Sequence, residues 1–322
     1  MELVSDTSYA ICKSMGKELA GFADIFEEAD LDMLVLLGDR FEIQMAAVAA
    51  MLYRIPVAHI HGGELTQGLM DDAIRHSVTK MSDLHFTSTS EYAQRVIQMG
   101  EQPERVFCVG ALGIENIKSI RLLSREQLCQ KFGDIFLHNY IMVTYHPVTL
   151  EKHTAGIQFQ KLLNVVENHP EYHYIFTYAN ADTDGAIINK MIESYTQEHK
   201  NTKAFVSMGQ LGYLSALQHC SAVLGNSSSG IIEAPSFHIP TINIGDRQKG
   251  RVRAKTVIDC GYETRDIEQA LTESQNQKFK DLCQESTNPY EGKNTSEQII
   301  MQIKKYLNQV QGKQKIFYDI EV

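Results

Sequence analysis

Short apolar runs alternate with stretches of helical periodicity along most of this chain, and this alternation constrains the fold more than any other sequence feature. Runs that are apolar on both faces are typical of a parallel sheet covered by helices on both sides. We therefore predict an α/β protein built from doubly wound parallel sheets. The expected strands cover residues 33–37, 56–60, 84–87, 106–109, 140–144, 174–177, 204–206, 222–224 and 240–244. The expected helices cover residues 43–53, 71–81, 90–98, 157–168, 185–199, 212–219 and 296–310.

The alternation of strands and helices is interrupted by a polar stretch from Ser124 to His138 and restarts at Tyr140. The chain has 322 residues, and at roughly 100–200 residues per domain this length corresponds to two domains. We predict an N-terminal Rossmann-like domain over residues 1–130, incomplete at its start. A C-terminal domain over residues 131–322 would follow and would end with the helix near 296–310.

Composition narrows the class of function. Thirty basic and forty acidic residues give a formal net charge of −10, which disfavours a general nucleic-acid or membrane-surface binder. A small anionic ligand held by a few arginines remains compatible with this charge. We see neither an apolar run long enough to cross a bilayer nor a secretory signal, and we expect a cytoplasmic protein. The six cysteines form no CxxC pair or Cys/His cluster, so we expect neither a zinc site nor a disulfide framework. We also expect that the protein needs no metal and no cofactor.

Ligands of such sheets bind at the carboxyl ends of the strands, so the residues that follow the strands carry the functional signal. Asp39 follows the first strand and is either the cap of the next helix or an acid/base carboxylate. Arg40 beside it could bind a phosphate group. After the second strand, we interpret His59 as a buried core histidine, while a glycine pair allows a tight turn after His61.

The second half of the chain carries the strongest local signal, the segment GNSSSGIIE at residues 225–233. Its hydroxyls and backbone N–H groups, between a strand and a helix, would suit a diphosphate. Glu233, expected in the first turn of that helix, would suit the two hydroxyls of a ribose. A basic loop at 245–251, which contains Arg247, follows another strand. Two anion-binding loops in one domain indicate a nucleotide diphosphate ligand.

These segments, taken in order, resemble those of the hydrolysing UDP-N-acetylglucosamine 2-epimerases of sialic-acid biosynthesis, the NeuC type. The resemblance rests on GDRFE, HIHGGE, DDAIRHSVTKMSDLHFTS, HPVT, NADTDG, GNSSSGIIE and NIGDRQKGR. It implies a GT-B-like architecture, with two Rossmann-like domains and the active site in the cleft. It also implies elimination of UDP from UDP-GlcNAc, hydration of the resulting 2-acetamidoglucal to N-acetylmannosamine, and a homodimer or higher homo-oligomer.

The resemblance also implies roles for individual residues. Asp39 and Asp71 match catalytic acidic positions, although Asp71 could instead cap a helix, and His146 matches the catalytic histidine. In several family members the position of His61 is a glutamate. Either His61 takes that role, or Glu64 reaches in, or neither does, and we rank His61 slightly first. The matching substrate-binding positions are Arg40, Asn180, Asp182, Ser227, Ser228, Glu233 and Arg247.

The sequence departs from the family at its start, because family members normally have a further strand and a Thr-Gly-x-Arg-Ala-type loop upstream of the position of Met1. We therefore expect a sheet strand and part of the phosphate site to be missing. Three alternatives stay open. The substrate could be UDP-2,4-diacetamido-2,4,6-trideoxyglucose of the legionaminic-acid pathway, the chain could be a GT-B glycosyltransferase, or it could be a truncated UDP-sugar binder with little activity.

Overall fold

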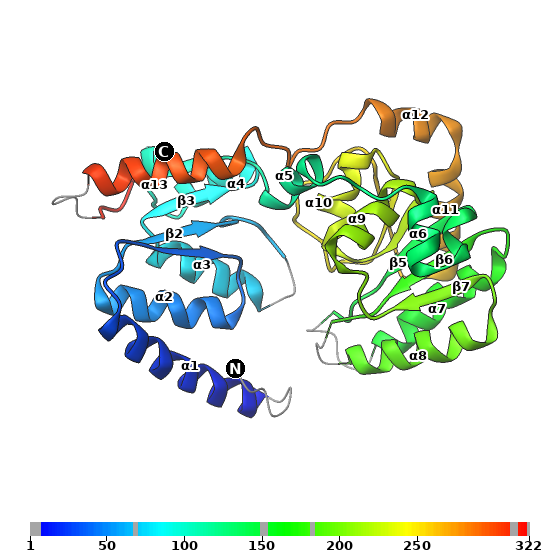
Figure 1. Cartoon of the computed structure of the whole chain (residues 1–322), viewed down its shortest axis with the longest axis horizontal. Helices are drawn as coiled ribbons and strands as arrows, with labels where there is room; N and C mark the ends of the chain where they lie inside the picture. The colour runs from blue at the N-terminus through cyan, green and yellow to red at the C-terminus, as the bar shows by residue number, and fades with distance from the viewer. Residues whose placement is uncertain (1–7, 67–69, 149–153, 181–183, 310–314, 321–322) are drawn as a thin grey trace. The chain divides into compact units, whose positions relative to one another are not determined.

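The computed structural model describes residues 8–66, 70–148, 154–180, 184–309 and 315–320 (Figure 1). The chain forms two compact units. Unit 1 contains the described residues of Met1–Thr66, Met70–Glu115 and Tyr290–Val322, and unit 2 contains those of Asn116–Pro289. Each unit has a parallel sheet covered by helices, which confirms the predicted α/β class. No helix within these described ranges is both long enough and apolar enough to cross a membrane.

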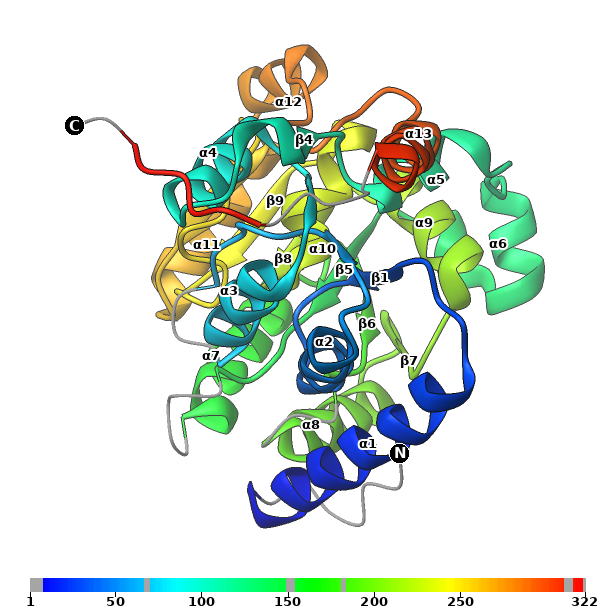
Figure 2. The same ribbon diagram turned by 90° about the vertical axis from the view of Figure 1, so that its left-hand side faces the viewer.

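The sheet of unit 1 has the order β1-β2-β3-β4, with all neighbours parallel. Its strands are β1 Leu34–Leu37, β2 Val57–Ile60, β3 Leu84–Thr87 and β4 Val106–Cys108. The main helices are α1 Ser8–Glu28, α2 Phe41–Tyr53, α3 Asp71–Met81, α4 Ser90–Gln98, α5 Leu112–Ser119 and α13 Thr295–Gln309. Helix α1 packs beside α2, as Figure 1 and Figure 2 both show. One core cluster joins these two helices to β1 and includes Phe26 and Leu36.

Helix α13 corrects the predicted division of the chain. The prediction placed residues 131–322 in one C-terminal domain, but Tyr290–Val322 belongs to unit 1. The reason is apolar packing, because Ile299 of α13 lies in a core cluster with Ala58, Ile60 and Phe86 of β2 and β3. A helix whose apolar side is buried in this way stabilises the sheet that it covers.

The sheet of unit 2 has the order β10-β9-β8-β5-β6-β7, again parallel throughout. Its strands are β5 Tyr140–Thr144, β6 His173–Thr177, β7 Thr202–Phe205, β8 Ala222–Gly225, β9 Thr241–Ile244 and β10 Val257–Cys260. Strand β5 pairs with β6 on one side and with β8 on the other, so the direction of strand addition reverses beside β5. Ligands of open α/β sheets bind at such a switch point.

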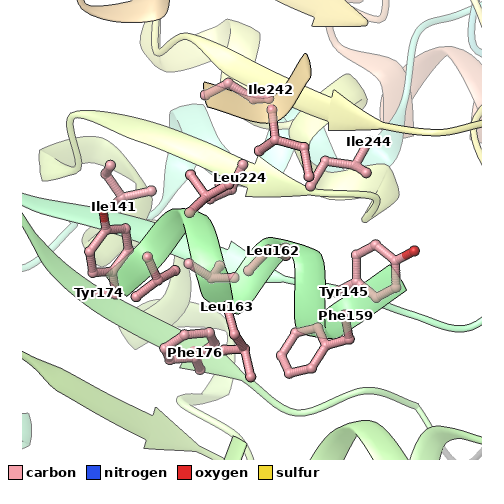
Figure 3. Packing of buried hydrophobic residues seen from close by; sticks show 14 of the residues in the cluster. Ile141, Tyr145, Phe159, Leu162, Leu163, Tyr174, Phe176, Leu224, Ile242 and Ile244 are labelled. Carbon is pink, nitrogen blue, oxygen red and sulfur yellow. The ribbon is translucent and has the colours of Figure 1, made fainter. Parts of the chain in front are cut away.

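Helices cover both faces of this second sheet. They are α6 Arg125–Phe132, α7 Ala155–Asn168, α8 Gly185–Glu198, α9 Gly209–His219, α10 Ser228–Ile232, α11 Thr264–Gln275 and α12 Gln277–Glu285. Figure 3 shows the core on one face, where Phe159 and Leu162 of α7 pack over Ile141, Leu224 and Ile242 of the strands.

The polar stretch at residues 124–138, which contains the predicted boundary between the two domains, folds as part of unit 2. Ser124 caps α6 through a capping box with Gln127, in which each side chain accepts a hydrogen bond from the other residue's backbone N–H. Leu128 and Phe136 are fully buried in the unit 2 core. A capped amphipathic helix explains the polar composition, because most of its side chains face solvent.

Candidate functional site

A pocket of about 370 Å³ lies at the carboxyl ends of the unit 2 strands, beside the switch point at β5. Four of the predicted site residues line it: His146, Asn180, Ser227 and Glu233. They follow β5, β6 and β8, as the rule for parallel sheets predicts. The structure therefore brings together side chains that lie up to about 90 residues apart in the sequence.

Asn226, which the sequence reasoning did not single out, holds this pocket together. Its side-chain amide pairs with the backbone of His146: Nδ2 donates to the carbonyl at 2.8 Å, and Oδ1 accepts from the backbone N–H at 2.7 Å. The carbonyl of Asn226 accepts from Gln248 at 2.8 Å and from Arg247 at 3.1 Å. The preceding Gly225 has φ of +139°, and a Cβ there would lie 1.9 Å from the carbonyl oxygen of Thr144. Only glycine lets β5 and β8 approach this closely.

His146 is held as a neutral imidazole. Its side chain is buried, and its Nδ1 accepts a hydrogen bond of 3.2 Å from the backbone N–H of Asn180. Burial, with a smaller contribution from the charge of Arg247, lowers the pKa of His146 to about 3. An imidazole that accepts at Nδ1 carries its proton on Nε2. His146 therefore offers a hydrogen-bond donor at neutral pH and carries no positive charge.

The serine-rich segment is shorter as a helix than expected. Ser227 is the N-cap of α10, where its hydroxyl accepts from the backbone N–H of Ser229 at 3.3 Å, and Ser228 is the first helical residue. Helix α10 ends at Ile232, so Glu233 is its C-cap and lies outside the first turn in which we expected it. The helix starts at the second serine of the motif, and Pro235 lies just beyond Glu233, where the chain continues as a 3-10 turn.

Glu233 is connected to the side chain of Tyr213 through Ser229. The Tyr213 hydroxyl donates to Ser229 Oγ at 2.8 Å. Burial raises the pKa of Glu233, and a hydrogen bond from Ser229 acts in the opposite direction. All three residues line the pocket. Ser229 and Tyr213 were missed by the sequence reasoning, because nothing in a run of three serines indicates which of them faces a pocket.

The remaining unit 2 predictions concern Asp182 and Arg247. Asp182 lies outside the described residues. Arg247 is partly buried, and its guanidinium contacts the loop that contains Asn226. This contact places a positive charge close to His146. An anion in the pocket would be attracted by that charge.

Unit 1 has its own cluster of polar side chains, centred on Arg75 of α3. Arg75 is almost fully buried, and its guanidinium pairs with Asp39 and, at 2.6 Å, with Asp72. It also donates to the hydroxyl of Thr66 at 3.1 Å and to the carbonyl of Glu64 at 2.7 Å. A buried guanidinium needs charge partners and hydrogen-bond acceptors, and both terminal nitrogens of Arg75 have them here. Arg75 therefore fixes the carboxylate of Asp39 and the loop after β2 together.

The loop after β2 contains a second hydrogen-bonded group. His61 Nδ1 lies 2.9 Å from Oε1 of Glu64, and Ser88 Oγ donates to the same oxygen at 2.9 Å. His59 is fully buried, as expected, with its ring nitrogens bonded to the Gly38 carbonyl and the Thr79 hydroxyl. Burial lowers the pKa of His59 to about 3, so it is a neutral core residue.

Two further predicted residues lie at the edges of the unit 1 cluster. Asp71 is the first residue of α3 and is partly buried. Arg40 is the N-cap of α2, its side chain is 63% exposed, and it pairs with Glu42 at 3.1 Å. Within the ranges that the structure describes, no group of three or more His, Cys, Asp or Glu side chains is arranged to hold a metal ion.

Comparison with known proteins places these features in a family. The family model described as UDP-N-acetylglucosamine 2-epimerase matches residues 1–304. The chain is 41% identical over 319 residues to the polysialic acid biosynthesis protein P7 of Escherichia coli. The aligned region covers 98% of this chain and 81% of that protein. It is 40% identical over 279 residues to the GDP/UDP-N,N'-diacetylbacillosamine 2-epimerase (hydrolyzing) of Campylobacter jejuni. This alignment covers 86% of this chain and 72% of that protein.

Solved structures agree on the fold. The UDP-GlcNAc 2-epimerase of Neisseria meningitidis bound to UDP-GlcNAc superposes with a TM-score of 0.79 at 20% identity, over 95% of this chain and 84% of that one. The MnaA–UDP structure of Staphylococcus aureus superposes with a TM-score of 0.78 at 18% identity, over 94% of this chain and 82% of that one. These likenesses confirm the GT-B-like class with two Rossmann-like units. The match to the family model over nearly the whole length and the two relatives near 40% identity show that the chain belongs to the UDP-N-acetylglucosamine 2-epimerase family.

Proposed function

We propose that this protein is a hydrolysing 2-epimerase that converts UDP-N-acetylglucosamine and water to N-acetylmannosamine and UDP. The observation that carries the proposal is the unit 2 pocket, in which a carboxylate, serine hydroxyls and a neutral histidine meet at the switch point of a parallel sheet. Membership of the family supports the same conclusion, because its members are UDP-sugar 2-epimerases. The acid/base side chains of unit 1 supply the groups that such a reaction needs.

The pocket suits the UDP part of the substrate. Ser227 offers a hydroxyl for a phosphate oxygen, and Ser228 adds one from the adjoining position. His146, the catalytic histidine of our assignment, offers a neutral Nε2–H donor to the leaving UDP. Arg247 adds a positive charge close by, which favours a diphosphate and stabilises it further as it leaves. Glu233 can accept hydrogen bonds from both ribose hydroxyls when it is ionised.

The chemistry requires two proton transfers at C2 of the sugar. In the first half-reaction a base removes the C2 proton, the C1–O bond to UDP breaks, and the electron pair forms the C1=C2 double bond of a 2-acetamidoglucal. In the second half-reaction water adds at C1 and loses a proton to a base, and an acid delivers a proton to the opposite face of C2. General acids and bases in such steps typically contribute about 10²–10⁴-fold each.

The carboxylates of unit 1 fit these roles. We assign Asp39 and Asp71 to proton transfer at the sugar, together with a third group from the loop after β2, which is either His61 or Glu64. Arg75 keeps the Asp39 carboxylate in a fixed orientation through a buried ion pair. Arg40, exposed at the start of α2, is assigned to the phosphate groups. Asn180 and Asp182 complete the substrate-binding set.

A second substrate is favoured by a specific observation. Two relatives, from Campylobacter jejuni at 40% identity and Legionella pneumophila at 36%, are named for N,N'-diacetylbacillosamine, the 2,4-diacetamido-2,4,6-trideoxy form of the sugar. The residues assigned above act on UDP and on C2, so they do not distinguish substituents at C4 and C6. The alternative is therefore hydrolytic 2-epimerisation of UDP-N,N'-diacetylbacillosamine by the same mechanism.

A side-by-side assay tests both proposals. The purified chain is incubated with UDP-GlcNAc and, separately, with UDP-N,N'-diacetylbacillosamine, and UDP and the free 2-epimer are quantified. We expect release of N-acetylmannosamine with UDP-GlcNAc. Turnover of the diacetamido sugar alone would move the assignment to the second substrate. Binding of UDP without turnover of either sugar, or transfer to an acceptor with no free epimer, would contradict the proposed function.

A further inference from the structure

The loop Ile60–Glu64 after β2 is held in place by three different elements. His61 donates its backbone N–H to Phe86 of β3 at 2.8 Å. The guanidinium of Arg75 on α3 donates to the Glu64 carbonyl at 2.7 Å, and Arg95 on α4 donates to the Gly63 carbonyl. A Cβ at Gly63 would lie 2.4 Å from the backbone oxygen of Tyr92, so the loop approaches α4 as closely as a glycine allows. The position of the His61 side chain is therefore fixed by its surroundings.

The backbone of His61 is in a conformation that L-residues rarely adopt. Its φ is +69°, in the left-handed region, at the end of a buried strand. Such a conformation persists only where the surrounding structure imposes it, and it is concentrated at functional sites. The side chain of His61 is 20% exposed, whereas the side chain of Glu64 is only 5% exposed.

One carboxylate oxygen of Glu64 is in contact with both the His61 imidazole and a serine hydroxyl. Its Oε1 is 2.9 Å from His61 Nδ1 and accepts from Ser88 Oγ at 2.9 Å. Ser88 follows directly after β3 and is 1% exposed, so its hydroxyl is a fixed part of the core. When a carboxylate accepts from Nδ1–H, it fixes the ring orientation and leaves Nε2 as the atom that exchanges a proton.

We propose that His61 is the base that removes the C2 proton, and that Glu64 and Ser88 are positioning residues that act through it. The proposal rests on the proposed function and chooses between its two candidates for the third proton-transfer group. The buried carboxylate of Glu64 is engaged by His61 and Ser88, whereas the imidazole is the more exposed of the two.

The step balances without any further reactant. The lone pair of His61 Nε2 takes the C2 proton while the C2–H electron pair forms the double bond and the C1–O pair leaves with UDP. The imidazolium that forms keeps its Nδ1–H on Glu64, whose negative charge stabilises the new positive charge. The hydrogen bond from Ser88 keeps the Glu64 carboxylate in the orientation that contacts His61. The proton returns to solvent before the next turnover.

Three variants test the proposal in the full chain. His61→Gln should lower kcat for UDP release by about 10²–10⁴-fold, the usual contribution of a general base. Glu64→Gln should cause a loss of the same order, and the double variant should lose no more than His61→Gln alone, because Glu64 acts only through His61. Ser88→Ala should lower kcat by at most roughly 10–150-fold, the range for one hydrogen bond to a charged group, while Ser88→Thr, which keeps a hydroxyl, should recover most of the loss. The matched controls are Ser77→Ala, at a partly buried serine on α3 whose hydroxyl donates to the Ala73 carbonyl, and Glu91→Gln, on the first turn of α4.

The double variant separates positioning from a purely structural role. A structural defect in the loop would add to the loss at His61, whereas a positioning residue has nothing left to position once His61 is replaced. Losses from His61→Gln and Glu64→Gln that multiply in the double variant would overturn the proposal.

A readout without substrate keeps this inference separate from the proposed function. In the ¹⁵N spectrum of the histidine side chains, His61 should show a protonated Nδ1 in the wild type, and this preference should weaken in Glu64→Gln and Ser88→Ala. UDP affinity measured by calorimetry should stay within about twofold in all variants, because these residues lie in unit 1. A protonated Nε2 in the wild type would contradict the dyad even if the enzyme is active. An intact dyad in a chain that turns over neither sugar would contradict only the proposed function.

Discussion

The two units carry polar side chains at equivalent places, after the strands of a parallel sheet, but they use them differently. In unit 1 these side chains are bonded to one another, as in the ion pair of Asp39 with Arg75 and the bond of His61 to Glu64. In unit 2 they line an open pocket of about 370 Å³, where Glu233 is one of the walls. Pre-bonded groups have fixed orientations, whereas a pocket leaves space for a ligand. We therefore propose that unit 1 supplies the acid/base groups at the sugar and that the unit 2 pocket binds UDP, with Arg40 of unit 1 as a further phosphate contact.

The largest effect is expected from the unit 1 carboxylates. Asp71→Asn and Asp39→Asn should each lower kcat by about 10²–10⁴-fold, because each would lose a proton-transfer group. UDP affinity should change by less than about twofold, since the UDP pocket lies in unit 2. Steady-state kinetics and UDP calorimetry on the same preparations measure both quantities.

Asp72→Asn is the matched control for Asp39→Asn. Asp72 pairs with the same guanidinium of Arg75 but has no assigned role at the sugar. If Asp39 matters only because it neutralises Arg75, the two variants should lose the same activity. A much larger loss for Asp39→Asn supports direct participation, and equal losses would contradict it.

The next effect concerns the wall of the unit 2 pocket. Glu233→Gln should weaken UDP binding by about 10–150-fold, which corresponds to the roughly 1.5–3 kcal/mol of hydrogen bonds to a charged group. Catalysis by bound substrate should be affected less, since Glu233 is assigned to the ribose. Glu193→Gln is the control, because Glu193 accepts from Tyr178 at 2.9 Å on the exposed side of the same region. If calorimetry gives an unchanged UDP affinity for Glu233→Gln, the assignment of Glu233 to the ribose is wrong.

The pH dependence of UDP binding should follow Glu233. Burial raises the pKa of this carboxyl above its usual range, and a protonated carboxyl cannot accept from both ribose hydroxyls. UDP affinity should therefore be highest well above the raised pKa and should fall as pH is lowered through it, by less than the full loss in Glu233→Gln. Titration of UDP at several pH values checks this, and Glu233→Gln should show a flatter dependence than the wild type.

The smallest effect should come from Tyr213→Phe. The variant removes the hydroxyl that donates to Ser229, and with it one link in the support of Glu233. We expect UDP affinity to fall by roughly 2–12-fold, the contribution of one neutral hydrogen bond. Ser229→Ala should lower it similarly. Losses that add fully in the double variant would show that the two residues act separately.

The strands were largely predictable from the sequence, and the reason is burial. All five residues of β5 are buried, and its bounds Tyr140–Thr144 are those that the apolar run indicated. Strand β10, Val257–Cys260, was missed because it is an edge strand that is only partly buried and contains the exposed Asp259. An edge strand needs only one apolar face, and four residues are too few to reveal an alternation.

The partner of a helix is harder to predict than the helix itself. The apolar spacing of residues 296–310 indicated α13, observed at Thr295–Gln309, but the same apolar side could pack against either sheet. The contact of Ile299 with β2 and β3 decides the question, and this contact is long-range in sequence. Local periodicity contains no information about such partners.

The site was predictable where it follows strands and unpredictable where it depends on burial. Asp39, His61 and His146 were found because they stand at strand ends. Ser88 stands directly after β3, and the same rule applied to that strand would have found it. Arg75 was missed because arginines are mostly exposed in folded proteins. Its position three residues after Asp72 was nevertheless a usable signal, because side chains with this spacing are neighbours on a helix.

The central claim is that this chain hydrolyses a UDP-sugar by elimination and then hydration, and the most direct test is turnover of UDP-GlcNAc in D₂O followed by proton NMR. Elimination removes the original C2 proton, and hydration delivers a new one from solvent. We predict free UDP and N-acetylmannosamine with one deuterium at C2 in every product molecule. Free N-acetylmannosamine that keeps its original hydrogen at C2, or UDP released together with unepimerised N-acetylglucosamine, would contradict it.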